Sequence, residues 1–347
     1  MNVTVYTDAE VFDLLREEWN PLVQRSVTNT IFLTWEWQSA WWHTYQAGRL
    51  WVLACRADDG QLIGIGPWFI HNLDGERVLR TIGCVDVTDY VDVIADRDHA
   101  EAVHAQFASY LREHADEYDR INLCNIPEES TTLELLPARL NACGFFAENV
   151  LQEVCPIIQL PDTWEGYLEN LDKKQRHELR RKLRRAEESE IEHVIVDHTH
   201  DLEAMIEQFL GLMKASHPQK ARFLEDEKNR AFFKRVLPIV FANGWLKLSF
   251  LMVNGTATAT YCDFDYQNHI LVYNSGLLPE QHANLSPGIV LLCLNIRHAI
   301  ETGHSVFDFL RGNETYKYRM GAMDTRVFKL RAQLRERIPE TIEGAHD

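Results

Sequence analysis

One order of elements occurs twice along the chain, and it constrains the fold more than any other feature: strand, turn, strand, helix, strand, helix. Hydrophobic periodicity and turn residues place the first copy at residues 50–57, 61–70, 100–115 and 121–126. They place the second copy at residues 245–253, 256–264, 288–302 and 306–310, after a helical region over about 164–241. The repetition predicts a duplicated α/β domain.

The two halves of the chain differ in charge. The 347 residues include 35 basic and 52 acidic ones, but residues 1–155 hold 10 Arg, no Lys and 25 of the acids. A chain of this length is too long for one comfortable core, so the break in composition predicts two domains, at 1–158 and 159–347. The net charge of −17 also argues against non-specific binding of DNA or of anionic membranes.

The cysteines and the apolar segments indicate a cytoplasmic protein. Seven cysteines form no CxxC pair and lie mostly in apolar stretches, so we expect reduced thiols in the core. The first ten residues, MNVTVYTDAE, lack the basic and apolar regions of a secretion signal. The longest apolar runs, such as residues 289–294, are far too short for a membrane span.

Several familiar catalytic motifs are absent from the sequence. It contains no GxxxxGK(S/T) phosphate loop, no GxSxG nucleophile turn, no HExxH zinc site and no GxGxxG after a strand. His198 and His200 could in principle bind a metal, but Thr199 or Asp201 beside them is a good N-cap for the following helix. We therefore expect a helix cap there and no metal.

Three segments remain as candidates for a site. The first is the start of helix 288–302, where Ser286 is a good N-cap, Pro287 suits the first helical position and Gly288 leaves room for a close approach. Free N–H groups at a helix start attract anions when no acidic side chain is near. The alternative is a well-capped structural helix.

The second candidate is DFLRGNETYKYRMG, residues 308–321. It begins at the end of a predicted strand, where open α/β sheets bind ligands. Charged and aromatic side chains crowd this segment: Asp308, Arg311, Glu314, Tyr316, Lys317 and Arg319. A structural network of ion pairs is the alternative.

The third candidate is the helix predicted over 171–189. Eight basic residues and one acid fall within 173–185, while Leu179, Leu183 and Ala186 form a thin apolar stripe. The wide basic face is either simply solvated or a receptor for a phosphate-bearing substrate or CoA.

Together these segments resemble the GNAT-superfamily acyltransferases, above all the two-domain CelD-like group and, more distantly, the FemAB peptidyltransferases. The resemblance spans nearly the whole chain. It rests on FLTWEWQSAWW from Phe32, DYVD at 89–92, the basic helix, the SPG helix start and FDFLRGNETYK from Phe307. It implies two tandem GNAT-like domains, each a mixed, mostly antiparallel sheet flanked by helices. The substrate site would lie between them or in the C-terminal one.

The resemblance also implies a co-substrate, acetyl-CoA or another acyl-CoA, and no metal. It would bind at the loop before helix 288–302, at Gln281, Asn284, Ser286 and Gly288 and at Ser275 on the preceding strand. The superfamily prefers glycine where this chain has Asn284 and Ser286, although asparagine tolerates left-handed backbone geometry. Acceptor binding is implied for Arg311, Arg319, Asp89, Tyr90 and Asp92.

For catalysis, the resemblance implies direct transfer to an amine in a ternary complex, without a covalent enzyme intermediate. Tyr316 would protonate the leaving thiolate, and Lys317, which matches the family's Tyr-Lys pair, would stabilise the oxyanion or a phosphate. Asp308 or Glu314 would act as the base or orient Lys317, and the sequence does not choose between them. The acceptor would be an amino sugar or amino acid of envelope or polysaccharide metabolism.

Two other functions stay open. A FemAB-like peptidyltransferase would use aminoacyl-tRNA, but a net charge of −17 makes a poor platform for RNA and the chain has no long helical-arm insertion. A non-catalytic binding or scaffold protein of the same fold is favoured by the altered loop at 281–286. A response to acetyl-CoA separates these classes.

Overall fold

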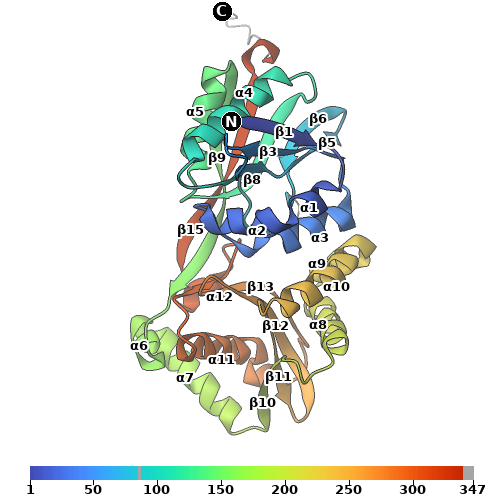
Figure 1. Cartoon of the computed structure of the whole chain (residues 1–347). Coiled ribbons are helices and arrows are strands. Elements are labelled where there is room, and N and C mark those ends of the chain that lie inside the picture. The colour runs from blue at the N-terminus through green and yellow to red at the C-terminus, as the bar shows by residue number, and fades with distance from the viewer. Residues whose placement is uncertain (85–86, 339–347) are drawn as a thin grey trace, which may run out of the picture. The chain divides into compact units, whose positions relative to one another are not determined.

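The computed structural model describes residues 1–84 and 87–338 and divides into two compact units (Figure 1). Unit 1 contains Met1–Glu153 together with the C-terminal residues from Arg326, and unit 2 contains Val154–Thr325. Both are mixed α/β structures in which most strand pairs are antiparallel, so the predicted fold class is confirmed.

Unit 1 holds two sheets with helices beside them. Its helices are α1 (Val11–Leu14), α2 (Arg16–Arg25), α3 (Trp35–Tyr45), α4 (Ala100–Glu113) and α5 (Thr132–Ala142). A four-stranded sheet has the order β1 (Asn2–Tyr6), β3 (Val52–Arg56), β4 (Leu62–Gly66), β7 (Ile94–Ala95). In the second sheet the order is β15 (Met323–Leu334), β8 (Arg120–Pro127), β6 (Glu76–Thr81), β5 (Trp68–Leu73), β2 (Arg49–Leu50).

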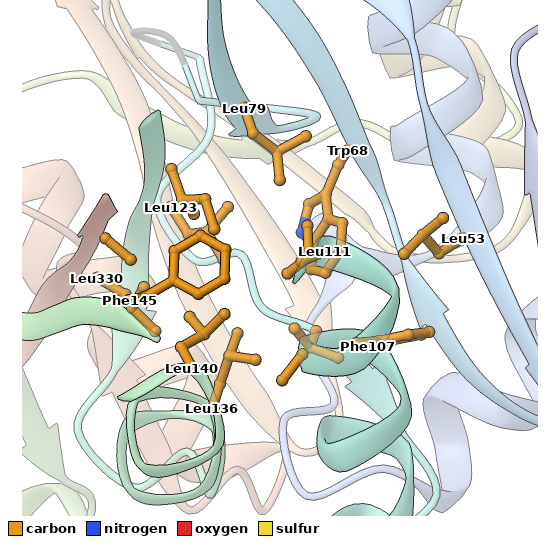
Figure 2. Close-up of a cluster of buried hydrophobic side chains, with 14 of the residues drawn as sticks. Leu53, Trp68, Leu79, Phe107, Leu111, Leu123, Leu136, Leu140, Phe145 and Leu330 are labelled. Carbon is orange, nitrogen blue, oxygen red and sulfur yellow. The ribbon is translucent and has the colours of Figure 1, made fainter. Parts of the chain in front are cut away.

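The core of unit 1 lies between helices α4 and α5 and the strands beside them (Figure 2). Phe107 and Leu111 of α4 are one helical turn apart, as are Leu136 and Leu140 of α5, and all four are fully buried. They pack against strand residues that alternate with polar ones, among them Leu79, Leu123 and Leu330. This arrangement leaves the opposite face of β8 and β15 to polar side chains.

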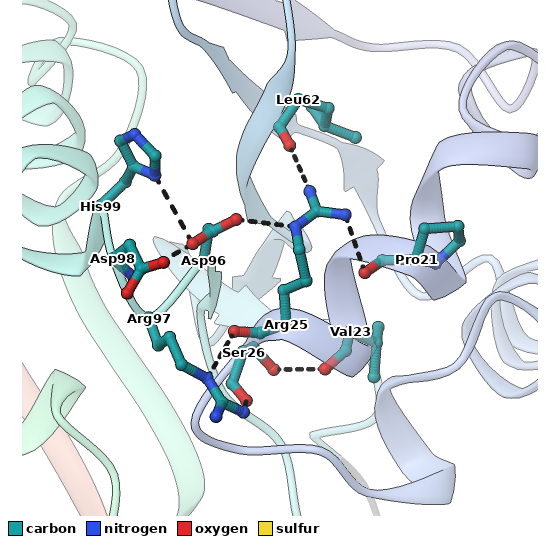
Figure 3. Close-up of polar contacts among 9 residues, drawn as sticks. All are labelled: Pro21, Val23, Arg25, Ser26, Leu62, Asp96, Arg97, Asp98 and His99. Atoms are coloured by element: carbon teal, nitrogen blue, oxygen red, sulfur yellow. Dashed lines mark hydrogen bonds and ion pairs between the residues drawn. The ribbon is translucent and has the colours of Figure 1, made fainter.

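An ion pair connects the end of α2 to the residue after β7 (Figure 3). Arg25 donates from Nε to Asp96 Oδ2 at 2.7 Å and from its two terminal nitrogens to the carbonyls of Pro21 and Leu62. Burial of Asp96 opposes its ionisation, but the hydrogen bonds from Arg25 and from the Asp98 amide outweigh it and hold the pKa of Asp96 below its usual value.

Replacing Arg25 by Met should therefore lower the free energy of unfolding by about 2 kcal/mol at pH 7, because the buried Asp96 carboxylate loses a charge-assisted partner. A urea titration measures this. The control is Arg49→Met, which breaks an exposed pair with Glu117 and should cost less than about 1 kcal/mol. The lowered pKa of Asp96 stabilises the fold above the unfolded value of about 4, so the effect of Arg25→Met should shrink as the pH falls below it. An effect that is constant down to pH 3 would contradict the assignment.

The sheet of unit 2 has the order β10 (Ile191–Ile195), β11 (Leu246–Val253), β12 (Thr256–Tyr266), β13 (His269–Leu277), β14 (Val306–Asp308), β9 (Phe145–Gln159). Its helices are α6 (Trp164–Asn170), α7 (Lys173–Glu187), α8 (Leu202–Ser216), α9 (Pro218–Glu225), α10 (Glu227–Ala242), α11 (Pro287–Glu301) and α12 (Thr315–Arg319). The turn between β11 and β12 is at Asn254-Gly255, as predicted, with positive φ at both residues.

Helices cover both faces of this sheet. Helix α11 packs on one face, against Tyr261 of β12. On the other face, Phe233 of α10 meets Tyr273 of β13, with 5.9 Å between the ring centroids. Helix α8 lies so close to β13 that a Cβ on Gly276 would sit 2.3 Å from the backbone nitrogen of Met213, so glycine is required there.

The strand that follows each sequence repeat continues from one unit into the other. Strand β9 follows α5, yet its residues 157–159 pair with β14; strand β15 follows α12, yet its residues 327–332 pair with β8. The observed units differ from the predicted domains 1–158 and 159–347 in two ways. The first segment of unit 1 ends at Glu153, and the residues from Arg326 belong to unit 1 instead of unit 2. Any free sheet edge can accept a strand, so local sequence contains no signal for this exchange.

Two further expectations were wrong. Cys84 and Cys124 form a disulfide, because the fold brings their Cα atoms to 6.0 Å, so not all seven cysteines are reduced thiols. The segment 191–195 lies in the predicted helical region but forms β10, which pairs with β11. In residues 1–84 and 87–338, no helix combines the length and the apolar character that a membrane crossing needs.

Candidate active site

An opening in the sheet of unit 2 separates strands β13 and β14. Strand β13 pairs with β12 from His269 to Leu277, but it pairs with β14 only as far as Leu271. A bulge on β13 shifts its register on β12 beside Tyr273, which bends the strand where its pairing with β14 ends. Among the described residues, the edge of β13 beyond Leu271 has no strand partner on that side. The opening lies at the carboxyl ends of two parallel strands, where α/β sheets bind ligands.

The end of β14 carries the predicted Asp308. Its carboxylate accepts a hydrogen bond from the Leu310 amide at 2.7 Å, and the residue is 5% exposed. Leu310 has a φ of +55°, in the left-handed region that costs a non-glycine residue about 1 kcal/mol. The Asp308 carboxylate thus holds a strained turn at the strand end. Strain of this kind is common at functional sites.

The loop after Leu310 is held by the predicted Lys317. This side chain is 2% exposed, and its ammonium donates to the carbonyls of Arg311 and Gly312 at 2.8 and 2.9 Å. Its Nζ also lies 2.9 Å from Glu314 Oε2 and 3.3 Å from the Leu310 carbonyl. Four oxygens surround an ammonium with three protons. The geometry therefore makes Lys317 the clamp of the loop rather than a free donor.

The predicted Tyr316 faces a cavity of about 580 Å³ that brings all three candidate segments together. It is lined by Lys174, Gln175, His177, Glu178, Leu179, Arg181, Lys182, Ile289, Tyr316, Arg319 and Met320. The hydroxyl of Tyr316 has no hydrogen-bond partner within the described part of the chain, and burial, reinforced by the charge of Glu314, raises its pKa well above the usual value. The phenol therefore stays protonated and available as a donor.

The basic helix α7 forms one wall of this cavity. It was predicted over 171–189 and spans Lys173–Glu187, with Asp172 as N-cap, and it buries Leu179 and Ala186. Its cationic side chains supply most of the charge in the lining, and the one acid there, Glu178, is ion-paired with Arg181 at 2.8 Å. The bonds from Arg181 hold the pKa of Glu178 at about 2. This wall of the cavity is therefore suited to bind an anionic ligand.

The predicted donor loop packs against α7. Lys182 donates to the Ser286 hydroxyl, and Arg185 donates to the Asn284 carbonyl at 2.9 Å. Ser286 precedes α11, but its side chain does not cap the helix: its φ of +54° is left-handed, so the hydroxyl turns toward Lys182. Gly288 is closely packed, because a Cβ there would lie 3.3 Å from Leu277, and Gln281 is exposed.

Lys220 of α9 was not recognised in the sequence. Its ammonium donates to the backbone carbonyl of the predicted Ser275 at 2.5 Å, on the part of β13 beyond the pairing with β14. Burial lowers the pKa of Lys220 to about 8, partly offset by the negative charge of Glu314. The charge of the same carboxylate contributes to the raised pKa of Tyr316, so Glu314 acts electrostatically on both groups. Nothing in the local sequence shows that this lysine is buried.

The remaining predicted residues are not all at this cavity. Arg319 lines it, and Arg311 lies in the clamped loop. Asp89, Tyr90 and Asp92 belong to unit 1.

Asp92 itself is committed to the fold of unit 1. It is 4% exposed and accepts hydrogen bonds from Thr28, Ser130 and the Val93 amide. Burial raises the pKa of Asp92, and these hydroxyl and amide donors partly offset the effect. Its oxygens therefore hold three segments of unit 1 together.

The histidine pair at 198 and 200 has a structural setting. Asp201 accepts from the Ala204 amide at 3.2 Å and caps α8, as predicted. His200 Nδ1 lies 2.8 Å from Asp197 Oδ1. Across residues 1–84 and 87–338, no three His, Cys, Asp or Glu side chains gather in a geometry that could hold a metal ion.

Comparison with known proteins supports the resemblance seen in the sequence. Residues 173–318 match the family described as the acetyltransferase (GNAT) domain. These residues run from α7 through α12 and include the whole cavity lining except Arg319 and Met320. A comparison with curated proteins finds no match.

Solved structures share the fold of nearly the whole chain. FemX has a TM-score of 0.65 and 11% identity, over 95% of this chain and 97% of its own. A protein of unknown function from Bacteroides thetaiotaomicron has a TM-score of 0.57 and 12% identity, over 96% and 100%. L-PGS from Bacillus licheniformis has a TM-score of 0.55 and 11% identity, over 95% and 93%. At these sequence identities, the comparison shows a shared fold.

Proposed function

We propose that this protein transfers an acyl group from acyl-CoA to an amine. Its residues 173–318 match the acetyltransferase (GNAT) domain family, and its two-unit fold is related to that of FemX. The observation that carries the proposal is the cavity lined jointly by α7, the start of α11 and α12. It offers cations for phosphates and, at Leu179, Ile289 and Met320, an apolar surface for an acyl-bearing arm. The acceptor class we propose is an amino sugar or an amino acid.

In the donor complex, the phosphates of acyl-CoA would lie against Lys174, Arg181 and Lys182, where charge-assisted hydrogen bonds are strongest. The first turn of α11 contains no acidic side chain, which supports this placement. The acyl thioester would then extend toward Tyr316.

In the transfer step, the acceptor amine loses a proton, its nitrogen attacks the thioester carbonyl, and the carbon–sulfur bond breaks to release CoA thiol. We assign proton removal to Lys220, because burial lowers its pKa to about 8 and so leaves part of the amine neutral near that pH. Asp308 is bonded to the Leu310 amide, and Glu314 is paired with Lys317. Tyr316 would donate a hydrogen bond to the departing sulfur. Lys317 acts as a positioning residue through the loop that it clamps.

Acetyl-CoA should raise the melting temperature of the wild-type protein by about 5 °C at a hundredfold excess over Kd, because a ligand of the native state stabilises it by mass action. Lys182→Met should weaken binding about tenfold in calorimetry, through loss of a charge-assisted contact.

Lys173→Met is the matched control, since Lys173 is exposed on the same helix and does not line the cavity. A melting temperature that ignores acetyl-CoA and longer acyl-CoAs alike would count against the proposal. Salt-dependent retention of tRNA instead would favour aminoacyl-tRNA as donor.

A further inference from the structure

A second cavity lies in unit 1, on the sheet face opposite the core. Its volume is about 610 Å³, within the range of small-molecule sites. It is lined by Arg120, Ile121, Asn122, Phe146, Glu148, Arg331, Ala332, Gln333 and Ile338. None of these residues takes part in the proposed acyl transfer.

The cations near this cavity differ from many arginines of the unit in their partners. With partners counted among the described residues, seven of the ten arginines in residues 1–155 form an ion pair with a carboxylate: Arg25, Arg49, Arg56, Arg77, Arg112, Arg120 and Arg139. Lys329 and Arg331 on β15 differ, because no carboxylate lies within ion-pair distance of either among the described residues. Other arginines of the unit, such as Arg97 and Arg337, bind backbone carbonyls instead of a carboxylate, whereas Arg331 lines the cavity and is exposed there.

These cations also lie close to a third. Leu330 and Ala332 belong to the core, so alternation along β15 directs Arg331 to the opposite face. Burial, together with the charges of Arg331 and Arg80, lowers the pKa of Lys329, which places the three cations within electrostatic range. Grouping like charges on a half-buried surface is unfavourable until an anion joins them.

Two acceptors complete the lining. Asn122 stands opposite Arg331 in the pairing of β8 with β15, and its side-chain oxygen is buried without a hydrogen-bond partner in the described chain. Such an atom costs about 1–3 kcal/mol unless a ligand or water donates to it. Glu148 offers a second acceptor. The lining therefore combines acceptors for ligand hydroxyls with a cation for negative charge.

Phe146 adds a flat apolar surface. It is 45% exposed, and the Arg335 guanidinium lies over its ring, 5.8 Å from the centroid. An exposed aromatic ring beside polar groups suits the apolar face of a sugar ring.

We propose that this cavity binds a hydroxyl-bearing phosphate ester of the size of a sugar phosphate. The phosphate contacts Arg331, with Lys329 adding long-range attraction, and ligand hydroxyls donate to Asn122 and Glu148. The ring lies against Phe146. The inference is independent of the acyl-transfer proposal, because it uses other residues and another unit.

The test is calorimetry of the full chain with glucose 1-phosphate, inorganic phosphate and glucose at low salt. Glucose 1-phosphate should bind at least tenfold more tightly than either of the others, because it alone offers both the charge and the hydroxyls. Arg331→Gln should weaken that binding at least tenfold, and Lys329→Gln should weaken it about threefold. Arg139→Gln, which alters a paired arginine of the same unit away from the cavity, should leave binding unchanged.

Three results would overturn the proposal. The first is no binding of glucose 1-phosphate at about 10 mM, and the second is equal binding of inorganic phosphate. The third is binding that survives Arg331→Gln but disappears in Lys182→Met, which would place the ligand in the cavity of unit 2. Arg331 is exposed, so the variant should fold, and its melting temperature checks this.

Discussion

Replacing Tyr316 by Phe should lower kcat for acyl transfer about 100-fold while leaving the affinity for acetyl-CoA within a factor of two. The phenol lines the cavity, has no hydrogen-bond partner among the described residues and stays protonated because burial raises its pKa. Losing a donor to the leaving sulfur raises the barrier by the amount typical of a general acid. The measurement is CoA thiol release from acetyl-CoA with an amine panel of amino sugars and amino acids.

Tyr318→Phe is the matched control for this prediction. It removes the same atom from the same short helix, but Tyr318 is 38% exposed and its hydroxyl donates to Asp324 at 2.8 Å. We expect less than a twofold change. If Tyr316→Phe kept the full rate with the true acceptor, the leaving-group role would have to be abandoned. A loss confined to KM would reassign Tyr316 to binding.

Replacing Lys220 should abolish the acid limb of the pH profile and lower kcat/KM about 100-fold at pH 8. A base must be deprotonated, so the wild-type rate should fall about tenfold per pH unit below the lysine pKa of about 8 and level off above it. The charged group that acts on this amine is Glu314, and the amine donates to the carbonyl and the hydroxyl of Ser275. Lys220→Met removes the amine and keeps most of the apolar volume.

Lys220→Arg separates chemistry from packing. Arginine keeps the positive charge and can still donate to Ser275, but it does not deprotonate in a protein. If Lys220 acts as a base, arginine therefore cannot restore activity. If Lys220 only holds β13 in place, arginine can restore it. Lys214→Met, at an exposed position of α8, is the control and should match wild type. An arginine variant with wild-type rates and an unchanged acid limb would rule out the base assignment and leave acyl transfer itself intact.

The local elements of the fold were predictable because they depend on short-range patterns. Helix α11 was expected at 288–302 and occurs at Pro287–Glu301, since its apolar residues repeat at helical spacing and Gly303 follows it. Asn254-Gly255 identified the hairpin, because only such residues accept positive φ at low cost. The basic helix was equally visible, from eight cations along one stretch.

The candidate site was predictable only in part. The sequence indicated that the segment 308–321 begins at the end of a strand, where ligands bind in α/β sheets, and the structure places Tyr316 at a cavity. The separate roles of Tyr316 and Lys317 could not be predicted from the sequence. Burial and the carbonyls of residues 310–312 decide that Lys317 clamps a loop, and both are properties of the folded loop.

By itself, the sequence determined the repeated α/β plan, the fold class and the family resemblance, because periodicity, turn residues and motif order are carried by neighbouring residues. Only the tertiary structure decided the pairing of β9 with β14 and of β15 with β8, the Cys84–Cys124 disulfide and the burial of Lys220. Each of these joins groups far apart in the chain. A free strand edge, a thiol or an ammonium carries no local mark of the partner that folding will bring to it.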